Sequence, residues 1–402
     1  MAYEETTETG YGDRLKNALG GIVTGFIMFI IGTVLLFWNE GNYVKTKKSL
    51  EEAEGVTVSV SDVSTVDPAL NGKLIHASAF ADTQDVLTDE LFGVSEKAIA
   101  VSRKVEYYQN VEHSSTKTKD KIGGGQEKVT TYTYETAWNS KPINSSEFKD
   151  PAYKATNFVL ATVEDKKVQA QNVTFGAYKL PPFIISSIRG DVPADAKLTN
   201  QELSAWESQI TKKMAELGLK KEGQMVHVAG NVVYFGKSTS TPSIGDVRVT
   251  LTKILPADIS IVAKVVGSTF EKFIASNKKE VSSVAMGTVS ADTMFAREQS
   301  ANSTMTWILR LVGIVLVIGG LKSMFGILPA LFKVLPFLGN IVGAGVALVC
   351  GVVGFAWSLI IISIAWLFYR PLIAVPMLVI AVAGIWYLKQ RGKQGKEVQA
   401  AN

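Results

Sequence analysis

Four apolar segments, each long enough to cross a membrane, constrain this chain of 402 residues more than any other feature. One segment lies near the amino terminus and three lie close together near the carboxyl end, with a long and more polar region between the first and the second. About 20 apolar residues cross the hydrocarbon core of a bilayer as a helix. The sequence therefore predicts a multi-pass α-helical membrane protein with four spans and a large α+β extramembrane domain between spans 1 and 2.

The predicted boundaries follow the changes in polarity along the chain. They are a polar cytoplasmic amino terminus (1–18), transmembrane helix 1 (19–38), the α+β domain (39–306), transmembrane helices 2 (307–325), 3 (341–368) and 4 (371–388), and a basic cytoplasmic tail (389–402). No small-residue cleavage motif follows Trp38, which favours an uncleaved anchor over a signal peptide. Arg310 lies one turn inside the second span, where its long side chain is expected to reach the interface.

The charges that flank the spans predict the orientation of the protein. The tail (389–402) is basic, and positive flanks favour the cytoplasm. Three lysines directly after the first span (45–48) argue for the opposite orientation, but flanking charge governs long translocated domains only weakly. With four spans, both termini are then cytoplasmic, and the large domain lies in a lumen, in the periplasm or outside the cell.

The predicted domain combines strands with one clear helix. Residues 104–113 and 127–138 are rich in Val, Thr and Tyr and flank a polar stretch with three glycines (123–125), which predicts a long β-hairpin. Further strands are predicted at residues 56–60, 73–80, 225–235 and 246–254.

The helix signal begins at Thr199, which has capping-box spacing to Glu202, and it ends at Gly218. Its apolar stripe comprises Leu203, Trp206, Ile210, Met214 and Leu217. This stripe favours a helix that covers a sheet, with a partner groove as the alternative. A second helix is expected to run without a break from residue 291 into span two.

The segment 175–188 has an amphipathic character that fits the headgroup boundary of a bilayer. The candidate membrane-surface contacts are Phe175, Tyr178, Phe183, Ile184 and Ile185. A loop followed by a buried strand is the alternative interpretation.

Span three is rich in the small residues that allow membrane helices to approach closely. Its candidate packing residues are Gly343, Gly351, Gly354, Trp357, Ser358 and Ser363. Tyr369, Arg370 and Pro371 separate spans three and four, and proline suits a sharp reversal. Spans three and four are therefore expected to form a helical hairpin with its turn at these residues.

The sequence lacks recognisable catalytic, metal-binding and nucleic-acid-binding motifs. The net charge is only +4, so a nucleic-acid role has no basic stripe. The one cysteine, Cys350, lies in a span, and the three histidines are scattered, which argues against a metal site. We expect no enzyme activity, no catalytic residue and no cofactor. A pore is the weakest hypothesis, because the spans offer no charged or polar lining.

Several strings carry a family resemblance over nearly the whole chain. They are VEYYQNV (105–111), YTYETAW (132–138), INSSEF (143–148), NEG (39–41), GDVRV (245–249) and WLFYRPL (366–372). The chain resembles the LUMA family of transmembrane proteins. This resemblance implies a protein of the endoplasmic reticulum and inner nuclear membrane that organises membrane protein complexes, associates with itself and contacts emerin and lamins. Bacterial relatives exist, for which the cell inner membrane is implied.

Together these features favour a non-enzymatic integral membrane scaffold that organises membrane protein complexes. The expected partners are the lipid bilayer, other membrane proteins of emerin or lamin type in a eukaryote, and further copies of this chain, with no nucleic acid. The alternative hypothesis is lipid sensing or lipid handling at the bilayer surface by the large domain.

Overall fold

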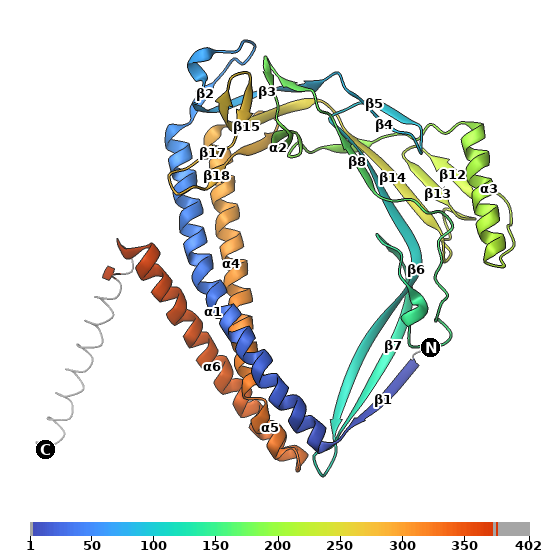
Figure 1. The fold of residues 1–402 in the computed structure, drawn as a ribbon, viewed down its shortest axis with the longest axis vertical. Coiled ribbons are helices and arrows are strands. Elements are labelled where there is room, and N and C mark those ends of the chain that lie inside the picture. Colours follow the sequence, from blue (N-terminus) through green and yellow to red (C-terminus); the bar gives the residue numbers. More distant parts are fainter. Residues whose placement is uncertain (1–2, 373–374, 377–402) are drawn as a thin grey trace, which may run out of the picture. The chain divides into compact units, whose positions relative to one another are not determined.

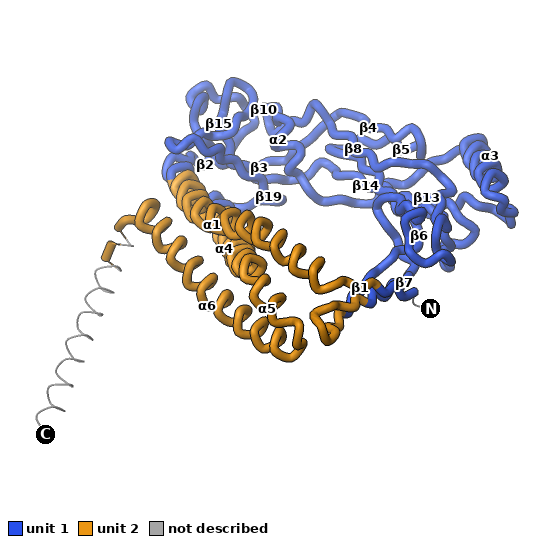
Figure 2. Tube along the Cα trace, turned by 60° about the horizontal axis from the view of Figure 1, so that its bottom comes forward, with its two compact units in different colours: residues 1–6, 52–117, 129–296 blue, residues 7–51, 118–128, 297–402 orange. Residues whose placement is uncertain are grey.

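The computed structural model describes residues 3–372, 375 and 376, and the chain divides into two compact units (Figure 2). Unit 1 comprises residues 1–6, 52–117 and 129–296. Unit 2 comprises residues 7–51, 118–128 and 297–402. Each unit is therefore assembled from stretches that are far apart in the sequence.

Long helices dominate unit 2 (Figure 1). The helices are α1 (Tyr11–Val56), α4 (Ala291–Met324), the short α5 (Ile327–Phe332) and α6 (Pro336–Tyr369), with the first residues of α4 and the last of α1 in unit 1. Large apolar side chains such as Val23, Leu311 and Leu348 are exposed on their outer faces. Such all-apolar exteriors suit helices that are surrounded by lipid.

The four-span prediction is wrong for the described residues. Three helical segments are long and apolar enough to cross a membrane: 11–56, 291–332 and 336–369. The predicted fourth span (371–388) and the basic tail (389–402) lie outside the described residues, apart from residues 371, 372, 375 and 376. An even number of spans is needed to place both termini on the same side of a membrane. The three candidate spans of the described residues therefore do not support the predicted orientation.

The predicted α+β domain between spans 1 and 2 is also wrong, since unit 1 is rich in β-structure and includes residues before the first helix. Strand β1 (Tyr3–Thr9) occupies the segment predicted as a polar tail and joins β7 (Gln126–Asn139). Within unit 1, the Tyr132 hydroxyl donates a hydrogen bond of 3.2 Å to Glu5. Without β1, strand β7 would be an edge strand with unpaired backbone N–H and C=O groups. Pairing with β1 gives these groups hydrogen-bond partners.

One sheet of eight strands carries the predicted hairpin. Its strands in order are β1, β7, β6 (Ala100–Asp120), β14 (Val247–Ile254), β13 (Val232–Phe235) and β12 (Val226–Ala229), with β11 (Asp191–Pro193) beside β14 and β8 (Lys166–Gln169) beside β6. The hairpin prediction is confirmed by β6 and β7, which are longer than expected. The predicted strand 225–235 is two strands, because Gly230 adopts a positive φ of 58° at a tight turn between them.

Helix α3 (Asn200–Glu216) covers this sheet, as its apolar stripe predicts. Thr199 and Glu202 form the complete capping box, and Ile210 is fully buried against sheet residues such as Phe235. The capping box satisfies backbone donors that would otherwise be unpaired at the first turn.

A second sheet of seven strands forms the other core of unit 1. Its strands in order are β10 (Tyr178–Lys179), β9 (Val173–Phe175), β3 (Leu74–Thr83), β15 (Ala257–Val266) and β16 (Thr269–Glu271), with β19 (Ser283–Met286) beside β15 and β2 (Val58–Val60) parallel to β3. Two-stranded sheets are formed by β4 (Val86–Asp89) with β5 (Val94–Lys97), and by β17 (Phe273–Ile274) with β18 (Glu280–Val281).

The membrane-surface interpretation of segment 175–188 needs correction. Phe175, Tyr178, Ile184 and Ile185 are all buried in the core beneath the seven-stranded sheet, the last two in the short helix α2 (Pro182–Ile185). Phe183 is partly buried against the same core. The apolar residues of this segment are explained by burial within the unit, so they provide no broad membrane-facing surface.

Candidate functional site in the helix bundle

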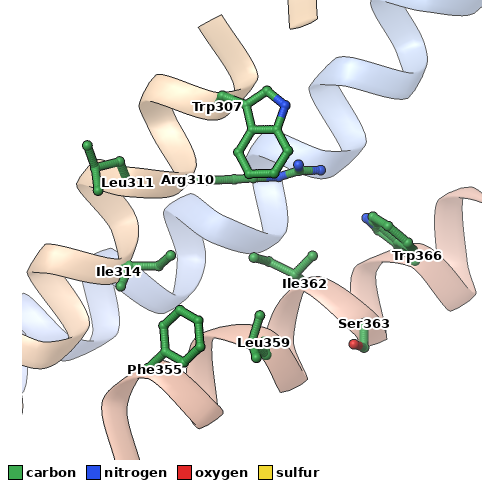
Figure 3. Close-up of a pocket in the computed structure, with 9 residues that line it drawn as sticks. All are labelled: Trp307, Arg310, Leu311, Ile314, Phe355, Leu359, Ile362, Ser363 and Trp366. Atoms are coloured by element: carbon green, nitrogen blue, oxygen red, sulfur yellow. The ribbon is translucent and has the colours of Figure 1, made fainter. Parts of the chain in front are cut away.

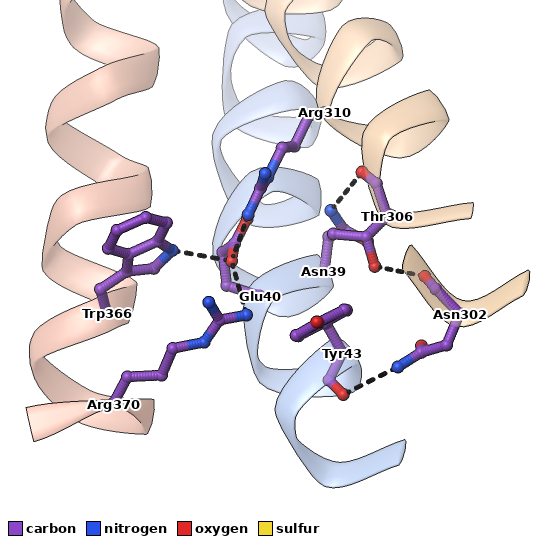
Figure 4. Close-up of polar contacts among 8 residues, drawn as sticks. All are labelled: Asn39, Glu40, Tyr43, Asn302, Thr306, Arg310, Trp366 and Arg370. Atoms are coloured by element: carbon purple, nitrogen blue, oxygen red, sulfur yellow. Dashed lines mark hydrogen bonds and ion pairs between the residues drawn. The ribbon is translucent and has the colours of Figure 1, made fainter. Parts of the chain in front are cut away.

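A fully buried carboxylate joins the three long helices of unit 2 (Figure 4). Glu40 of α1 has no exposed surface. Arg310 of α4 donates two hydrogen bonds to it, Nε to Oε1 at 2.5 Å and Nη2 to Oε2 at 2.9 Å. This two-pronged contact suits the planar guanidinium group and fixes α4 against α1.

Helix α6 completes the surroundings of this carboxylate. The indole Nε1 of Trp366 donates to Oε2 of Glu40 at 2.9 Å, and Nη2 of Arg370 lies 4.0 Å from the same oxygen. Arg370 also lies over the ring of Tyr43, 4.5 Å from its centroid. The two guanidinium groups and one carboxylate leave one excess positive charge among these side chains, because arginine remains protonated.

Amide groups extend the polar contacts along α1 and α4. The Asn39 amide donates to the carbonyl of Thr306 at 3.0 Å, and the Asn302 amide donates to the carbonyl of Tyr43 at 3.1 Å. Gly41 faces Tyr369 so closely that an added Cβ would lie 2.6 Å from the Tyr369 ring. All three residues of the string Asn39-Glu40-Gly41 therefore have a role in holding the helices together. We refer to the eight residues drawn in Figure 4 as the polar cluster.

An apolar pocket of about 530 Å³ opens beside the polar cluster, between α4 and α6 (Figure 3). Its lining from α4 includes Trp307, Leu311 and Ile314. Phe355 and Leu359 face them from α6. Arg310 and Trp366, the two hydrogen-bond donors to Glu40, also line this pocket. The pocket is thus apolar along most of its length and adjoins the polar cluster at these two residues.

Glycines place the backbones of α1 and α4 in direct contact. A Cβ at Gly25 would lie 2.6 Å from the carbonyl oxygen of Gly320, and one at Gly32 would lie 2.9 Å from that of Gly313. Small residues at such positions are typical of packed membrane helices. The closest helix approach therefore involves spans one and two, whereas the sequence analysis emphasised span three.

The candidate packing residues of span three divide into two groups. Gly354 packs on Ile318, where a Cβ would lie 2.8 Å away, and the buried Ser358 donates to the Gly354 carbonyl. Trp357 donates to the Thr33 hydroxyl of α1 at 3.1 Å.

The other three candidates make little contact with neighbouring helices. A Cβ at Gly351 would meet no atom within 4 Å, and one at Gly343 would meet only Pro329, at 3.6 Å. Ser363 is exposed and lines the pocket. Within the described chain, Gly351 therefore has open space beside it, and Ser363 faces the pocket between α4 and α6.

The predicted reversal begins where expected. Helix α6 ends at Tyr369, and Arg370 leaves the helical conformation with φ −137° and ψ 54°. Most of the second arm of the predicted hairpin lies outside the described residues, so only the end of α6 before Pro371 is confirmed.

The tip of the β6–β7 hairpin belongs to unit 2 and contacts the opposite end of its helices. Asp120 forms ion pairs with Arg14 of α1, at 2.7 Å, and with Lys333 after α5. The backbone N–H of Gly123 donates to the Val334 carbonyl at 3.0 Å. Burial opposes ionisation of Asp120, but the hydrogen bonds from Lys333 and Arg14 hold its pKa below the ordinary value.

Carboxylates on the sheets of unit 1 are engaged in structural contacts. Glu106 accepts two hydrogen bonds from Arg248, and although burial opposes ionisation, this partner lowers its pKa. Burial raises the pKa of Asp246, which accepts a hydrogen bond of 2.6 Å from the Tyr234 hydroxyl. Among the described residues, no group of three or more His, Cys, Asp or Glu side chains could hold a metal ion.

The polar cluster was missed by sequence reasoning, which placed Glu40 at the start of the large domain and expected Arg310 to reach the membrane interface. Arg310 instead turns inward, and its side chain is only 12% exposed. The sequence did contain a signal for this contact, since Glu40 and Arg310 lie at the ends of two apolar segments. Opposite charges at membrane depth tend to pair with each other.

Comparison with known proteins agrees with the family resemblance that the sequence strings carry. The model of the family described as transmembrane protein 43 matches residues 107–371. The chain is 28% identical to transmembrane protein 43 of Homo sapiens over 404 residues, which cover 96% of this chain and 94% of the relative. It is 26% identical to a homolog of Drosophila melanogaster over 373 residues, covering 91% and 93%. No solved structure matches it. The matched region includes the long apolar helices α4 and α6 and most of the β-rich unit. The chain is therefore a membrane protein that belongs to the transmembrane protein 43 (LUMA) family.

Proposed function

We propose that this chain is a non-enzymatic scaffold that organises membrane protein complexes. The observation that supports this role best is the buried Glu40, which receives donors from both α4 and α6 and so holds three membrane helices in one fixed arrangement. A bundle fixed from within can present its outer faces to other helices without rearranging.

The outer face of α6 is the proposed site of self-association. A Cβ at Gly351 would meet nothing within 4 Å, and Ala347 lies four residues earlier, which gives the small-xxx-small spacing of membrane helix contacts. Leu348 is exposed close by. We infer that a second copy of this chain packs here, so that the scaffold is a homo-oligomer.

The compartment and the other partners follow from the family resemblance. In a eukaryotic cell, we propose the endoplasmic reticulum and inner nuclear membrane, with membrane proteins of emerin type or lamins as partners. In a bacterium, we propose the cell inner membrane. Fractionation of cells that express a tagged full-length chain tests each proposal. Recovery mainly in the plasma membrane of a eukaryotic cell contradicts the first, and recovery mainly in the outer membrane or the soluble fraction of a bacterium contradicts the second.

Cysteine crosslinking in native membranes tests the self-association. With Cys350→Ala as background, Leu348→Cys is expected to give a crosslinked dimer, whereas Leu367→Cys, which is also exposed but nineteen residues along α6, is expected to give little. Adding Gly351→Leu is expected to abolish the Leu348 crosslink, because it fills the open space without an internal clash.

The matched control for bulk is Gly354→Leu, which collides with Ile318 inside the bundle and is expected to lower stability instead. Equal crosslinking at Leu348 and Leu367, or an undiminished crosslink with Gly351→Leu, would show that this face is not the interface. A monomeric protein that captures no membrane partner would argue against the scaffold role itself.

A further inference from the structure

We propose that the pocket between α4 and α6 binds one acyl chain of an anionic phospholipid, with the lipid phosphate against Arg370. This site is independent of the proposed self-association, since Gly351 does not line the pocket.

The apolar part of the pocket suits a hydrocarbon chain. Its volume of about 530 Å³ is within the range of small-molecule sites. Ile314, Phe355 and Leu359 line it with carbon atoms only. Aliphatic chains gain contact energy from such surfaces, and in a bilayer they are the molecules most abundantly available.

The charge beside the pocket favours a negative group. Arg310 is committed to Glu40 through two short hydrogen bonds. Arg370 lies farther from the same carboxylate, at 4.0 Å, and its side chain is more exposed, 21% against 12%. The excess positive charge of the polar cluster is therefore carried mainly by Arg370, whose guanidinium group can donate to phosphate oxygens.

The two parts are adjacent, which a single lipid molecule requires. Trp366 lines the pocket and also lies against Arg370, 5.3 Å from its guanidinium carbon to the ring centroid. Trp307 lines the same end of the pocket and stacks with Arg310 at 4.6 Å. Tryptophans typically lie at the level of lipid headgroups, so the positive charge and the mouth of the pocket share the depth at which a phosphate is found.

Native mass spectrometry of the full-length protein tests this proposal. The protein is reconstituted in vesicles that contain equal amounts of phosphatidylglycerol and phosphatidylcholine, then released and analysed for retained lipid. We expect phosphatidylglycerol to be retained in preference to phosphatidylcholine. Ser363→Trp, which fills the pocket from an exposed position, and Arg370→Gln, which removes the charge, are each expected to reduce retained phosphatidylglycerol about tenfold.

Two control variants separate this site from general effects. Ile360→Trp adds the same bulk on an exposed face of α6 that does not line the pocket, and Lys322→Gln removes an exposed charge elsewhere on α4. Both are expected to retain phosphatidylglycerol as the unmodified protein does. Because Arg370→Gln can also disturb folding, Ser363→Trp provides the second, independent measurement.

Other results would overturn the proposal. Equal retention of the two lipids would show that no headgroup charge is recognised, and undiminished retention by Ser363→Trp would show that the lipid binds elsewhere. A photocrosslinker at Leu311 that captures residues 377–388 of the same chain, rather than lipid, would show that the protein fills its own pocket.

Discussion

Glu40 is a costly residue to place between apolar helices, and its partners explain why it is tolerated. A carboxylate removed from water must be paired and hydrogen-bonded, or its burial opposes folding. Arg310 supplies the paired charge and Trp366 supplies a third hydrogen bond. Each of these partners comes from a different helix, so satisfying one side chain requires the whole bundle to assemble.

Removing this carboxylate charge is predicted to destabilise the bundle. Glu40→Gln leaves Arg310 and Arg370 without their counter-ion, and loss of one member of a buried ion pair costs about 3 kcal/mol. We expect a clear fall in the thermal unfolding midpoint in detergent. Glu51→Gln is the matched control on the same helix, since Glu51 is exposed and pairs with Lys47 at 3.6 Å, and its effect should be below about 1 kcal/mol. Equal midpoints for the two variants would contradict a structural role for Glu40.

At the scale of elements, the contact between α1 and α4 depends on paired glycines. Gly25 and Gly32 are seven residues apart on α1, and Gly313 and Gly320 are seven residues apart on α4. A seven-residue repeat returns to the same face of a helix after two turns. The two backbones can therefore approach at two levels, and α6 packs alongside through Gly354 and Trp357.

Adding one methyl group at this contact is predicted to separate the helices. A Cβ at position 320 would lie 2.6 Å from both the Gly25 carbonyl oxygen and the Phe29 nitrogen, and these backbone atoms cannot rotate away. Gly320→Ala should therefore destabilise the protein by about 1–3 kcal/mol, as overpacking does.

Gly20→Ala is the matched control, because its added Cβ meets no atom within 4 Å. It should leave stability unchanged or raise it by up to about 1 kcal/mol, since alanine favours helix more than glycine. Thermal unfolding of the two variants in the same detergent gives the comparison. A stable Gly320→Ala protein would mean that α1 and α4 are farther apart than the structure has them.

At the scale of the whole molecule, the chain passes repeatedly between its two units. Strands β6 and β7 belong to unit 1 over most of their length, but their tip, residues 118–128, belongs to unit 2. Asp120 is the ion-pair partner that attaches this tip to Arg14 and Lys333. These ion pairs therefore hold the hairpin tip to the helices within unit 2.

Attachment of the tip is predicted to depend on ionised Asp120. Its pKa lies below the ordinary 3.8 in the folded protein, so the stabilisation is fully present above that pH and is lost as the pH falls through the lowered value. A spin label on Ile122→Cys, in a Cys350→Ala background, should report an immobile tip between about pH 5 and 8.

Asp120→Asn should release the tip at all of these pH values. Glu127→Gln, which removes a half-buried carboxylate's ion pair with Lys121 on the same tip, should not. Spectra of Asp120→Asn that match those of the unmodified tip would show that the backbone contact at Gly123 holds the hairpin without the ion pairs.

Local signals in the sequence determined many individual elements. The Thr199 capping box and the apolar stripe of α3 predict that helix because both depend on residues within a few turns of one another. The Val, Thr and Tyr pattern likewise predicts the β6–β7 hairpin, and apolar length predicts the three described helices that can cross a membrane. The family strings point to membership of the transmembrane protein 43 family.

Only the tertiary structure decided which distant residues meet. Burial of Phe175 and Ile184 depends on strands that follow and precede them in the sequence, so their apolar character alone could not distinguish a core from a membrane surface. Glu40 and Arg310 are separated by 270 positions, and their pairing depends on how closely glycines allow α1 and α4 to approach. Contacts of this kind are set by the packing of whole helices, which no local pattern records.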